Sequence, residues 1–423
     1  MYLASSRSTD VPKGPATGHP PGSGPARKGL AGTVVALGAV SLVSDISSEM
    51  VTAVMPLYFV LGLGLSPLQF GFLDGIYNGI SAFVRLAGGH IADRRQRYKA
   101  VAGAGYALSA LCKLGLLFAG TSTPALSTAL AADRVGKGIR TGPRDALITL
   151  SCDPSDLGRA FGVHRAMDTT GALLGPLAAF ALLWATMDSY ESVFVVSFCF
   201  GVLGVLILFA FVPGHRDTAD RKTAAPRLRD TLGLVREPGF RRMLITASAL
   251  GLVTVGDGFI FLLLQSRLDF TAGYLPLLPL GTALVYLTLA VPFGRIADRH
   301  GRRGLYLLGH AALLAVYAVL LTPLGGPALL VAALLLHGTF YAATDGVLMA
   351  LAGPSLPETQ RGGGLAILQT GQALGRLLAS VLFGAAWAAW GTQPALALAA
   401  AALAVTLPIS LFLLPTPPQE PTS

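Results

Sequence analysis

Apolar runs of roughly 20 residues recur along the whole chain, separated by short segments rich in polar residues, glycine or proline. An α-helix needs about 20 predominantly apolar residues to cross a hydrocarbon core about 30 Å thick. Twelve runs meet this description: 31–60, 67–91, 99–120, 124–150, 160–186, 190–212, 241–265, 272–297, 304–322, 327–350, 363–390 and 393–414. The pattern therefore predicts an all-α membrane protein with twelve transmembrane helices.

Composition and charge agree with this prediction. Hydrophobic residues occupy 53% of the 423 positions and charged residues only 13%, whereas a soluble protein carries about 25% charged residues. Lysine and arginine gather in alternate loops, which predicts a multi-pass protein of the inner or plasma membrane with both termini in the cytoplasm. This sidedness accounts for the formal net charge of +9, so no nucleic-acid partner is expected. The three cysteines lack metal-binding spacing, and no metal site, disulfide or cofactor is expected.

The polar segments divide the chain into domains. Residues 1–30 are rich in proline, glycine and serine and lack the apolar core of a secretory signal, which predicts a disordered cytoplasmic tail. The last residues, 415–423, form a second short tail. The longest internal polar segment, 213–240, is interpreted as a cytoplasmic linker between two sets of six helices, 31–212 and 241–414.

The two sets of helices repeat short motifs. "GGHIADRRQR" at 88–97 is echoed by "FGRIADRHGRR" at 293–303, and "GALLGP" at 171–176 by "GQALGR" at 371–376. Each pair lies in corresponding helices of the two halves. Internal repeats of this kind are typical of transporters in which two similar bundles flank a central site. We therefore expect two six-helix bundles of similar structure.

These motifs resemble those of the major facilitator superfamily over almost the whole chain. Its loop motif G-x-L-A-D-R-x-G-R-[RK] is matched by Gly89, Asp93 and Arg94 in the first half and by Gly294, Asp298 and Arg299 in the second. The first copy departs from the pattern because Gln96 replaces the second glycine. The fourth-helix motif R-x-x-x-G is met by Arg134 and Gly138. The antiporter-associated motif of the fifth helix is met by Gly162, Gly171, Gly175 and Pro176, without the paired glycines that should follow.

The resemblance implies a fold, a mechanism and a set of gating residues. A monomer would move a small molecule through a site near the middle of the membrane by alternating access. The two loop copies would form charged contacts that hold the cytoplasmic side shut, although positive-inside anchoring also explains their arginines. Gly171, Gly175 and Pro176 would allow close helix packing and bending. The segments "GKGIRTGPRDAL" and "GRAFGVHRAMDTTGALLGP" further resemble a bacterial subgroup of permeases.

Two acidic residues in the first apolar run need an explanation. Asp45 and Glu49 are one helical turn apart and share a face. A charged side chain in the membrane interior costs about 2.5–3.5 kcal/mol or more, unless it is paired or faces water. Two neighbouring carboxylates also repel each other, which favours uptake of a proton. We interpret the pair as a proton carrier; a permanent ion pair with a nearby cation, or a role in lining the substrate path, is the alternative.

The fourth and fifth helices supply further charges. Arg134, Lys137, Arg140 and Arg144 form a basic stripe on the fourth helix. We expect Arg134 and Lys137 to reach the first helix and to contact substrate, and Arg140 and Arg144 to extend to the membrane interface. In the fifth helix, His164 and Asp168 are candidates for a proton relay and Arg165 for substrate binding. A structural cluster that locks the two helices together is the alternative for all three.

The second half contains fewer charges in its predicted spans. Asp257, Asp345, Gln369 and Gln372 are candidate substrate-binding residues, and His337 and Arg376 add polar groups to the same bundle. Some of these side chains are expected only to tie helices together. Asp74 and Lys113, at similar predicted depth in the second and third helices, are expected to form a structural ion pair.

The function that these features favour is secondary active transport. No GxxxxGK[ST] motif is present, so ATP is not the expected energy source. We predict proton-coupled antiport that exports a small organic molecule, with protons, the substrate and the lipid bilayer as partners. Uptake of a small organic anion by symport is the main alternative. A non-transporting receptor or an intramembrane enzyme is disfavoured, because neither an extra domain nor a nucleophile setting is visible.

Overall fold

A computed structural model describes residues 32–77, 79–80, 84, 98–152, 157–213, 233–353, 356–357 and 361–414. All regular structure in this part of the chain is helical. The predicted tails 1–30 and 415–423, and residues 214–232 of the predicted linker, lie outside the described residues.

The described residues of the first half form six helices. A helix at 67–77 follows the first of them, and the others are α1 (Gly32–Leu57), which continues into a π-helical turn η1 (Tyr58–Gly62), α3 (Tyr98–Phe118), α4 (Thr123–Leu150), α5 (Leu157–Ala185) and α6 (Tyr190–Phe211). Ser122 and Ser189 precede α4 and α6 as N-caps, and their hydroxyl groups accept hydrogen bonds from the backbone N–H of Ala125 and Ser192.

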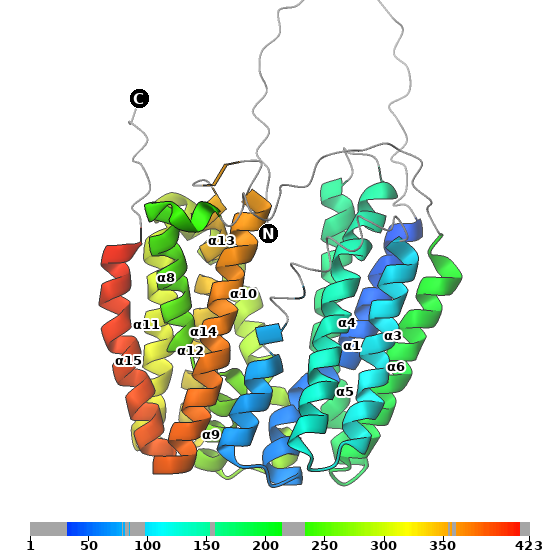
Figure 1. Ribbon diagram of the computed structural model, residues 1–423. Coiled ribbons are helices and arrows are strands. Elements are labelled where there is room, and N and C mark those ends of the chain that lie inside the picture. Colours follow the sequence, from blue (N-terminus) through cyan, green and yellow to red (C-terminus); the bar gives the residue numbers. More distant parts are fainter. Residues whose placement is uncertain are drawn as a thin grey trace, which may run out of the picture.

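The second half also contains six spans, two of which are broken into two helices. Its elements are η3 (Leu234–Arg236), α8 (Pro238–Leu252) with α9 (Asp257–Leu268), η4 (Ala272–Tyr274), α10 (Leu277–His300), α11 (Arg302–Leu321), α12 (Gly326–Thr344) with α13 (Val347–Ala352), α14 (Arg361–Trp390) and α15 (Thr392–Leu413). The sharp turns before α11 and α15 have Gly301 at φ 96° and Gly391 at φ 85°, a backbone conformation that favours glycine. The two halves stand side by side in Figure 1.

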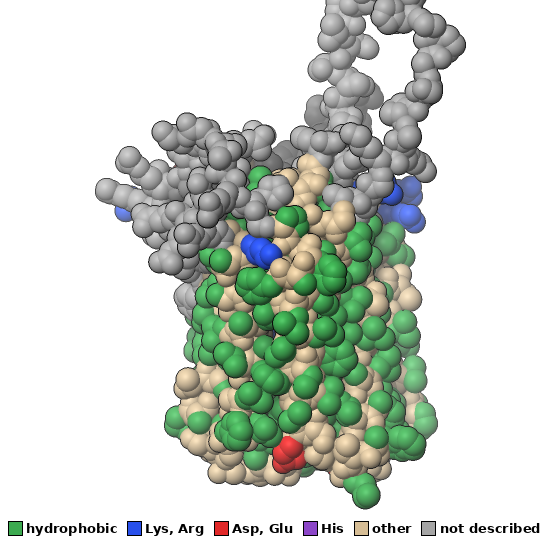
Figure 2. All heavy atoms as spheres, turned by 90° about the vertical axis from the view of Figure 1, so that its right-hand side faces the viewer, with side chains coloured by type: hydrophobic (Ala, Val, Ile, Leu, Met, Phe, Trp, Pro, Cys, Tyr) green, Lys and Arg blue, Asp and Glu red, His purple; other side chains and the backbone are tan. Residues whose placement is uncertain are grey.

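Ten of these spans are long and apolar enough to cross a membrane, counted over the described residues. The helix α4 is not among them because it carries six charged side chains, and only part of the second helix is described. Together the helices confirm the predicted all-α membrane fold of twelve spans. The side of the molecule formed by α3 and α6 is largely hydrophobic between its two ends (Figure 2), with Leu111, Leu206 and Phe209 each more than half exposed. Lipid contact explains this exposure.

Glycines allow equivalent helix pairs to pack closely in each half. In the first half, a Cβ atom on Gly175 of α5 would lie 2.7 Å from the Cβ atom of Glu49 on α1, and one on Gly171 would meet the carbonyl of Leu42. In the second half, a Cβ atom on Gly375 of α14 would lie 2.9 Å from the backbone nitrogen of Leu252 on α8. Larger residues at these positions would push the helices apart.

Candidate functional site

Two adjoining cavities lie between the halves. The deeper one, which we call the deep cavity, has a volume of about 230 Å³. The other, the vestibule, has a volume of about 690 Å³ and lies towards the end of the molecule where α1 begins and α15 ends (Figure 1). Tyr77, Tyr341 and Arg376 line both cavities, so these three side chains mark the junction.

The opposite end of the interface is closed by aromatic contacts between the halves. The ring of Phe259 on α9 lies 4.8 Å from that of Phe70 in the first half, measured between centroids, and Phe383 of α14 packs against Phe259 from within the second half at 4.9 Å. Nearer the end of the molecule, the rings of Phe180 on α5 and Tyr274 are 5.5 Å apart. These contacts separate the deep cavity from that side, while the vestibule occupies the other.

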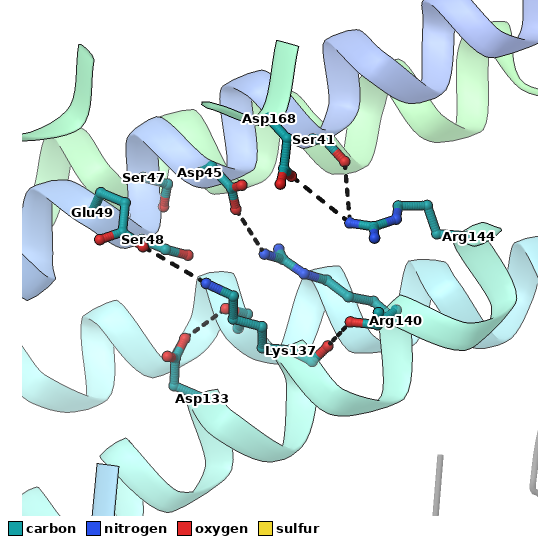
Figure 3. A network of polar contacts seen from close by, with 12 residues as sticks. Ser41, Asp45, Ser47, Ser48, Glu49, Asp133, Lys137, Arg140, Arg144 and Asp168 are labelled. Carbon is teal, nitrogen blue, oxygen red and sulfur yellow. Dashed lines mark hydrogen bonds and ion pairs between the residues drawn. The ribbon is translucent and has the colours of Figure 1, made fainter. Parts of the chain in front are cut away.

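The two acids of α1 are both paired with cations of α4 (Figure 3). Asp45 Oδ1 lies 3.2 Å from Arg140 Nη2, and the side chains are only 12% and 4% exposed. Glu49 Oε1 lies 3.7 Å from Lys137 Nζ, and both groups are about one-third exposed. The prediction that Lys137 reaches α1 is confirmed. The prediction that Arg140 extends to the membrane interface is wrong, because its guanidinium turns inward to neutralise Asp45.

A second charge cluster is buried between α3 and α4 around Asp133. Its carboxylate oxygen Oδ1 accepts hydrogen bonds from Lys113 Nζ at 2.6 Å and from Ser109 Oγ at 2.5 Å. The other oxygen, Oδ2, accepts a hydrogen bond from Arg134 Nη2 at 2.5 Å. The Arg134 guanidinium also lies 3.8 Å from the centroid of the Tyr77 ring. Sequence reasoning missed Asp133, although it directly precedes Arg134 in the chain.

This cluster corrects two expectations. Lys113 pairs with Asp133 and not with Asp74, which instead accepts a hydrogen bond from Ser380 of α14, in the other half. Arg134 does not reach an acid of α1, because its neighbour Asp133 already supplies the counter-charge. A hydrophobicity pattern fixes the depth of a residue but not the rotation of its helix, and rotation decides which partner is near.

The candidate relay of α5 is only partly assembled. His164 is buried, with its Nε2 atom 2.8 Å from the hydroxyl of Ser41 on α1, and Arg144 approaches the same hydroxyl at 3.5 Å. Asp168 Oδ2 lies 3.4 Å from the exposed Arg165, and Asp168 Oδ1 lies 3.9 Å from Arg144. His164 and Asp168 therefore share Arg144 as a neighbour, and no hydrogen bond is recorded between them in the described residues.

In the second half, Asp257 lies at a break between two helices. The chain leaves α8 at Leu252 and resumes helix at Asp257, and the Val253 carbonyl and the Val255 N–H between these residues have no partner within a helix. The hydroxyl of Tyr317 on α11 takes the place of the missing helical partners. It accepts a hydrogen bond from the Val255 N–H at 2.7 Å and donates one to the Val253 carbonyl oxygen at 3.2 Å. Interrupted helices with satisfied backbone groups are common at transporter binding sites.

The Asp257 carboxylate faces the deep cavity and contacts α12. Its oxygens lie 2.7 and 2.6 Å from the Tyr341 hydroxyl, and Oδ1 is 3.3 Å from Nε2 of the buried His337. Asp345, predicted to lie on a helix, instead ends α12, where it is exposed and accepts from the Tyr286 hydroxyl at 3.1 Å. These contacts bring Asp257 and Asp345 to different cavities.

Three polar side chains of α14 face the interface. Gln369 and Gln372 line the vestibule, and Arg376 lines both cavities. Within the described residues, no carboxylate oxygen lies within 4.0 Å of Arg376, and its buried Nε atom has no hydrogen-bond partner. The repeat "GQALGR" contained this arginine, but the sequence did not indicate that it lacks a partner.

The predicted gating residues are only partly described. Gly89, Asp93 and Arg94 lie outside the described residues. Gly294 and Arg299 lie in the last turns of α10 and are exposed, and the backbone of Asp298 belongs to the same helix.

Comparisons with known proteins identify relatives in sequence and structure. A family model described as Major Facilitator Superfamily matches residues 37–284 and 259–423. An uncharacterized MFS-type transporter of Methanocaldococcus jannaschii is 27% identical over 290 residues, 66% of this chain and 70% of the relative. The multidrug resistance protein MdtH of Photorhabdus laumondii is 25% identical over 253 residues, 58% and 59% of the two chains. Among solved structures, the nucleoside transporter NupG is similar with a TM-score of 0.77 and 13% identity, covering 91% of this chain and 100% of NupG.

Proposed function

The chain belongs to the Major Facilitator Superfamily, and on that premise we propose that this transporter is a proton-coupled antiporter that exports a small organic molecule. Membership of the family makes the protein a transporter and not an enzyme. The observation that carries the proposal is the pair of cavities between the halves, with two carboxylates of α1 at their lining: Asp45 at the vestibule and Glu49 at the deep cavity. Substrate and proton could thus be bound at one interface whose access changes sides.

The proposed cycle uses the ion pairs between α1 and α4. A proton that neutralises an acid of α1 removes the attraction to its cation on α4 and so changes the balance between two arrangements of the helices. Asp45 and Glu49 are the proposed proton carriers. His164 and Asp168 join the proposal as groups that take up or release a proton beside Arg144, whose guanidinium stays charged throughout. Lys137, Arg165, Asp257, Asp345, Gln369 and Gln372 are the proposed substrate contacts that line the cavities or lie at their edge.

Closure of the vestibule would bring the helix ends of the two halves together. Asp298 and Arg299 at the end of α10 are proposed to take part in charged contacts that hold this closed state. Gly171, Gly175 and Pro176 would let α5 bend against α1 during the change, because the two glycines permit close contact and the proline leaves a carbonyl free. We also propose that the protein acts as a monomer in the cell membrane with both termini in the cytoplasm.

Proton flux in proteoliposomes tests the coupling. Ligands would first be found by thermal stabilisation of the purified protein with a panel of drugs, sugars and organic anions. Vesicles containing a pH-sensitive dye would then receive each ligand that binds. Antiport predicts that protons leave as ligand enters, whereas the alternative, uptake symport of a small organic anion, predicts that protons enter with it. Coupling through these acids would be contradicted if ligand movement in the wild type carries no protons. It would also be contradicted if Asp45→Asn and Glu49→Gln each move as many protons as the wild type.

A further inference from the structure

We propose that Arg376, together with Gln372 and Gln369, binds a carboxylate or phosphate group on the transported molecule. The inference rests on the proposed transport function and names its substrate class, a small organic molecule with one oxyanion group. The basis is a comparison of all positively charged side chains that line the two cavities, since an uncompensated cation binds a ligand anion without first giving up a carboxylate of the protein.

The described cations of the first half that line the cavities are all compensated within the protein. Each lies within 4.0 Å of a carboxylate: Arg134 of Asp133, Lys137 of Glu49, Arg140 of Asp45, Arg144 of Asp145 and Arg165 of Asp168. A ligand anion at this basic stripe would therefore compete with a carboxylate that is already bound. The stripe gives the vestibule an arginine-rich lining without offering a free positive charge.

Arg376 differs from every cation in that set. Its Nε atom is buried without a hydrogen-bond partner, and no acid of the described residues reaches it within 4.0 Å. Asp257 lies within electrostatic range, but its oxygens accept from the Tyr341 hydroxyl and contact His337 instead. A buried donor without a partner costs about 1–3 kcal/mol, and a bound anion would remove that cost.

The neighbouring glutamines extend the donor set along one face of α14. Gln372 is one turn before Arg376 and Gln369 two turns before it, so the three side chains follow one line from the vestibule to the deep cavity. No hydrogen bond of either glutamine side chain is recorded among the described residues. A planar guanidinium presents two parallel N–H groups to a carboxylate or phosphate, and an amide adds a further donor.

The deep cavity supplies space for the rest of the molecule. Phe59, Phe70 and Phe261 form apolar walls in a volume of about 230 Å³. The acids in its lining are themselves engaged: Glu49 with Lys137, Asp74 with Ser380 and Asp257 with Tyr341. A ligand whose aromatic or aliphatic part packs against Phe59, Phe70 and Phe261, and whose oxyanion binds Arg376, fits these apolar and charged parts of the cavity lining.

Binding of four probes with the same ring and different head groups tests the inference. Benzoate and phenyl phosphate carry the two oxyanions, benzamide is a neutral analogue of benzoate, and benzylamine is a cation. Thermal stabilisation of the full-length protein in detergent would be titrated with each probe at up to millimolar concentration. Three variants are compared with the wild type. Arg376→Gln removes the charge, and Arg376→Lys keeps the charge but not the two parallel N–H groups of the guanidinium. Arg241→Gln changes an exposed arginine of α8 and serves as a matched control.

The expected result is that benzoate, phenyl phosphate or both stabilise the wild type more strongly than benzamide and benzylamine. Arg376→Gln should lower the affinity for the stabilising anion about ten- to a hundredfold. Arg376→Lys should lower this affinity less, and Arg241→Gln should leave it unchanged. The better oxyanion identifies the substrate's acidic group. Three outcomes overturn the inference: unchanged anion binding in Arg376→Gln, stronger binding of benzylamine, or no stabilisation by either anion.

The proton-flux assay separates this inference from the proposed coupling. If an anion binds through Arg376 but its movement carries no protons, the anion site stands and the proposed coupling fails. If a ligand exchanges for protons and its binding is unaffected by Arg376→Gln, the coupling stands and the anion site fails.

Discussion

Removal of one partner from the buried Asp45–Arg140 pair should destabilise the protein strongly. In Arg140→Gln the Asp45 carboxylate keeps its position at 12% exposure but loses the cation that was 3.2 Å away. An uncompensated charge in such a site costs about 3–5 kcal/mol. With an unfolding entropy of about 2.1 cal/mol/K per residue, a chain of this length loses roughly 1 °C of apparent melting temperature per kcal/mol. A decrease of about 3–5 °C is therefore expected.

Thermal unfolding in detergent, followed by reaction of the buried Cys112 with a thiol-specific fluorescent dye, measures this decrease. The double variant Asp45→Asn with Arg140→Gln removes both charges, and it should recover most of the loss because no unpaired charge is left. Lys137→Gln is the comparison, since its contact with Glu49 is longer, at 3.7 Å, and both side chains are partly exposed. Lys137 also acts on Asp45 from a distance, and a partly exposed cation of this kind contributes about 1 kcal/mol or less. The reasoning fails if Arg140→Gln and Lys137→Gln lose equal stability, or if the double variant is no more stable than Arg140→Gln.

Three further substitutions test the packing of the interior by the same thermal assay. Tyr317→Phe should cost about 1–3 kcal/mol, because the Val255 N–H loses its acceptor at the break between α8 and α9; an unchanged melting temperature would show that water replaces the hydroxyl. Gly175→Leu should destabilise the contact of α5 with α1, whereas Gly162→Ala, with no atom within 4 Å of the added carbon, should have no effect. Lys113→Met should cost about 3–5 kcal/mol, because a buried Asp133 loses one of its two cations; equal stability of Lys113→Met and wild type would mean that Arg134 suffices alone.

The spans could be predicted from the sequence because each depends on a local property. A run of about 20 apolar residues must cross the bilayer as a helix, whatever its neighbours are. The break before Asp257 could not be predicted in the same way. It depends on Tyr317, about 60 residues further along the chain, to satisfy the freed backbone groups of Val253 and Val255.

Ion-pair partners were harder to predict than helices. The sequence indicates that Asp45 and Glu49 need an explanation, because the cost of an isolated charge depends on its depth, and an ion pair with a nearby cation is one of the alternatives that it leaves open. Their particular partners depend on helix rotation and spacing. Arg140 reaches Asp45 because α4 runs close to α1, and Lys113 turns to Asp133 because α3 and α4 approach closely: a Cβ atom on Gly105 would lie 2.7 Å from the carbonyl oxygen of Gly136.

The different environments of Asp45 and Glu49 suggest different roles for two acids that look equivalent in sequence. Asp45 is held at 3.2 Å by a cation that is only 4% exposed, so loss of this contact would leave a buried charge unpaired at a cost of several kcal/mol. Glu49 is 27% exposed, lines the deep cavity, and its more distant partner Lys137 can turn towards water. Loss of that contact costs little. With the vestibule arranged as it is here, Asp45 therefore holds α1 to α4 more firmly than Glu49 does. The Asp45–Arg140 contact lies at the lining of the vestibule, so in the proposed cycle its opening accompanies the change of access.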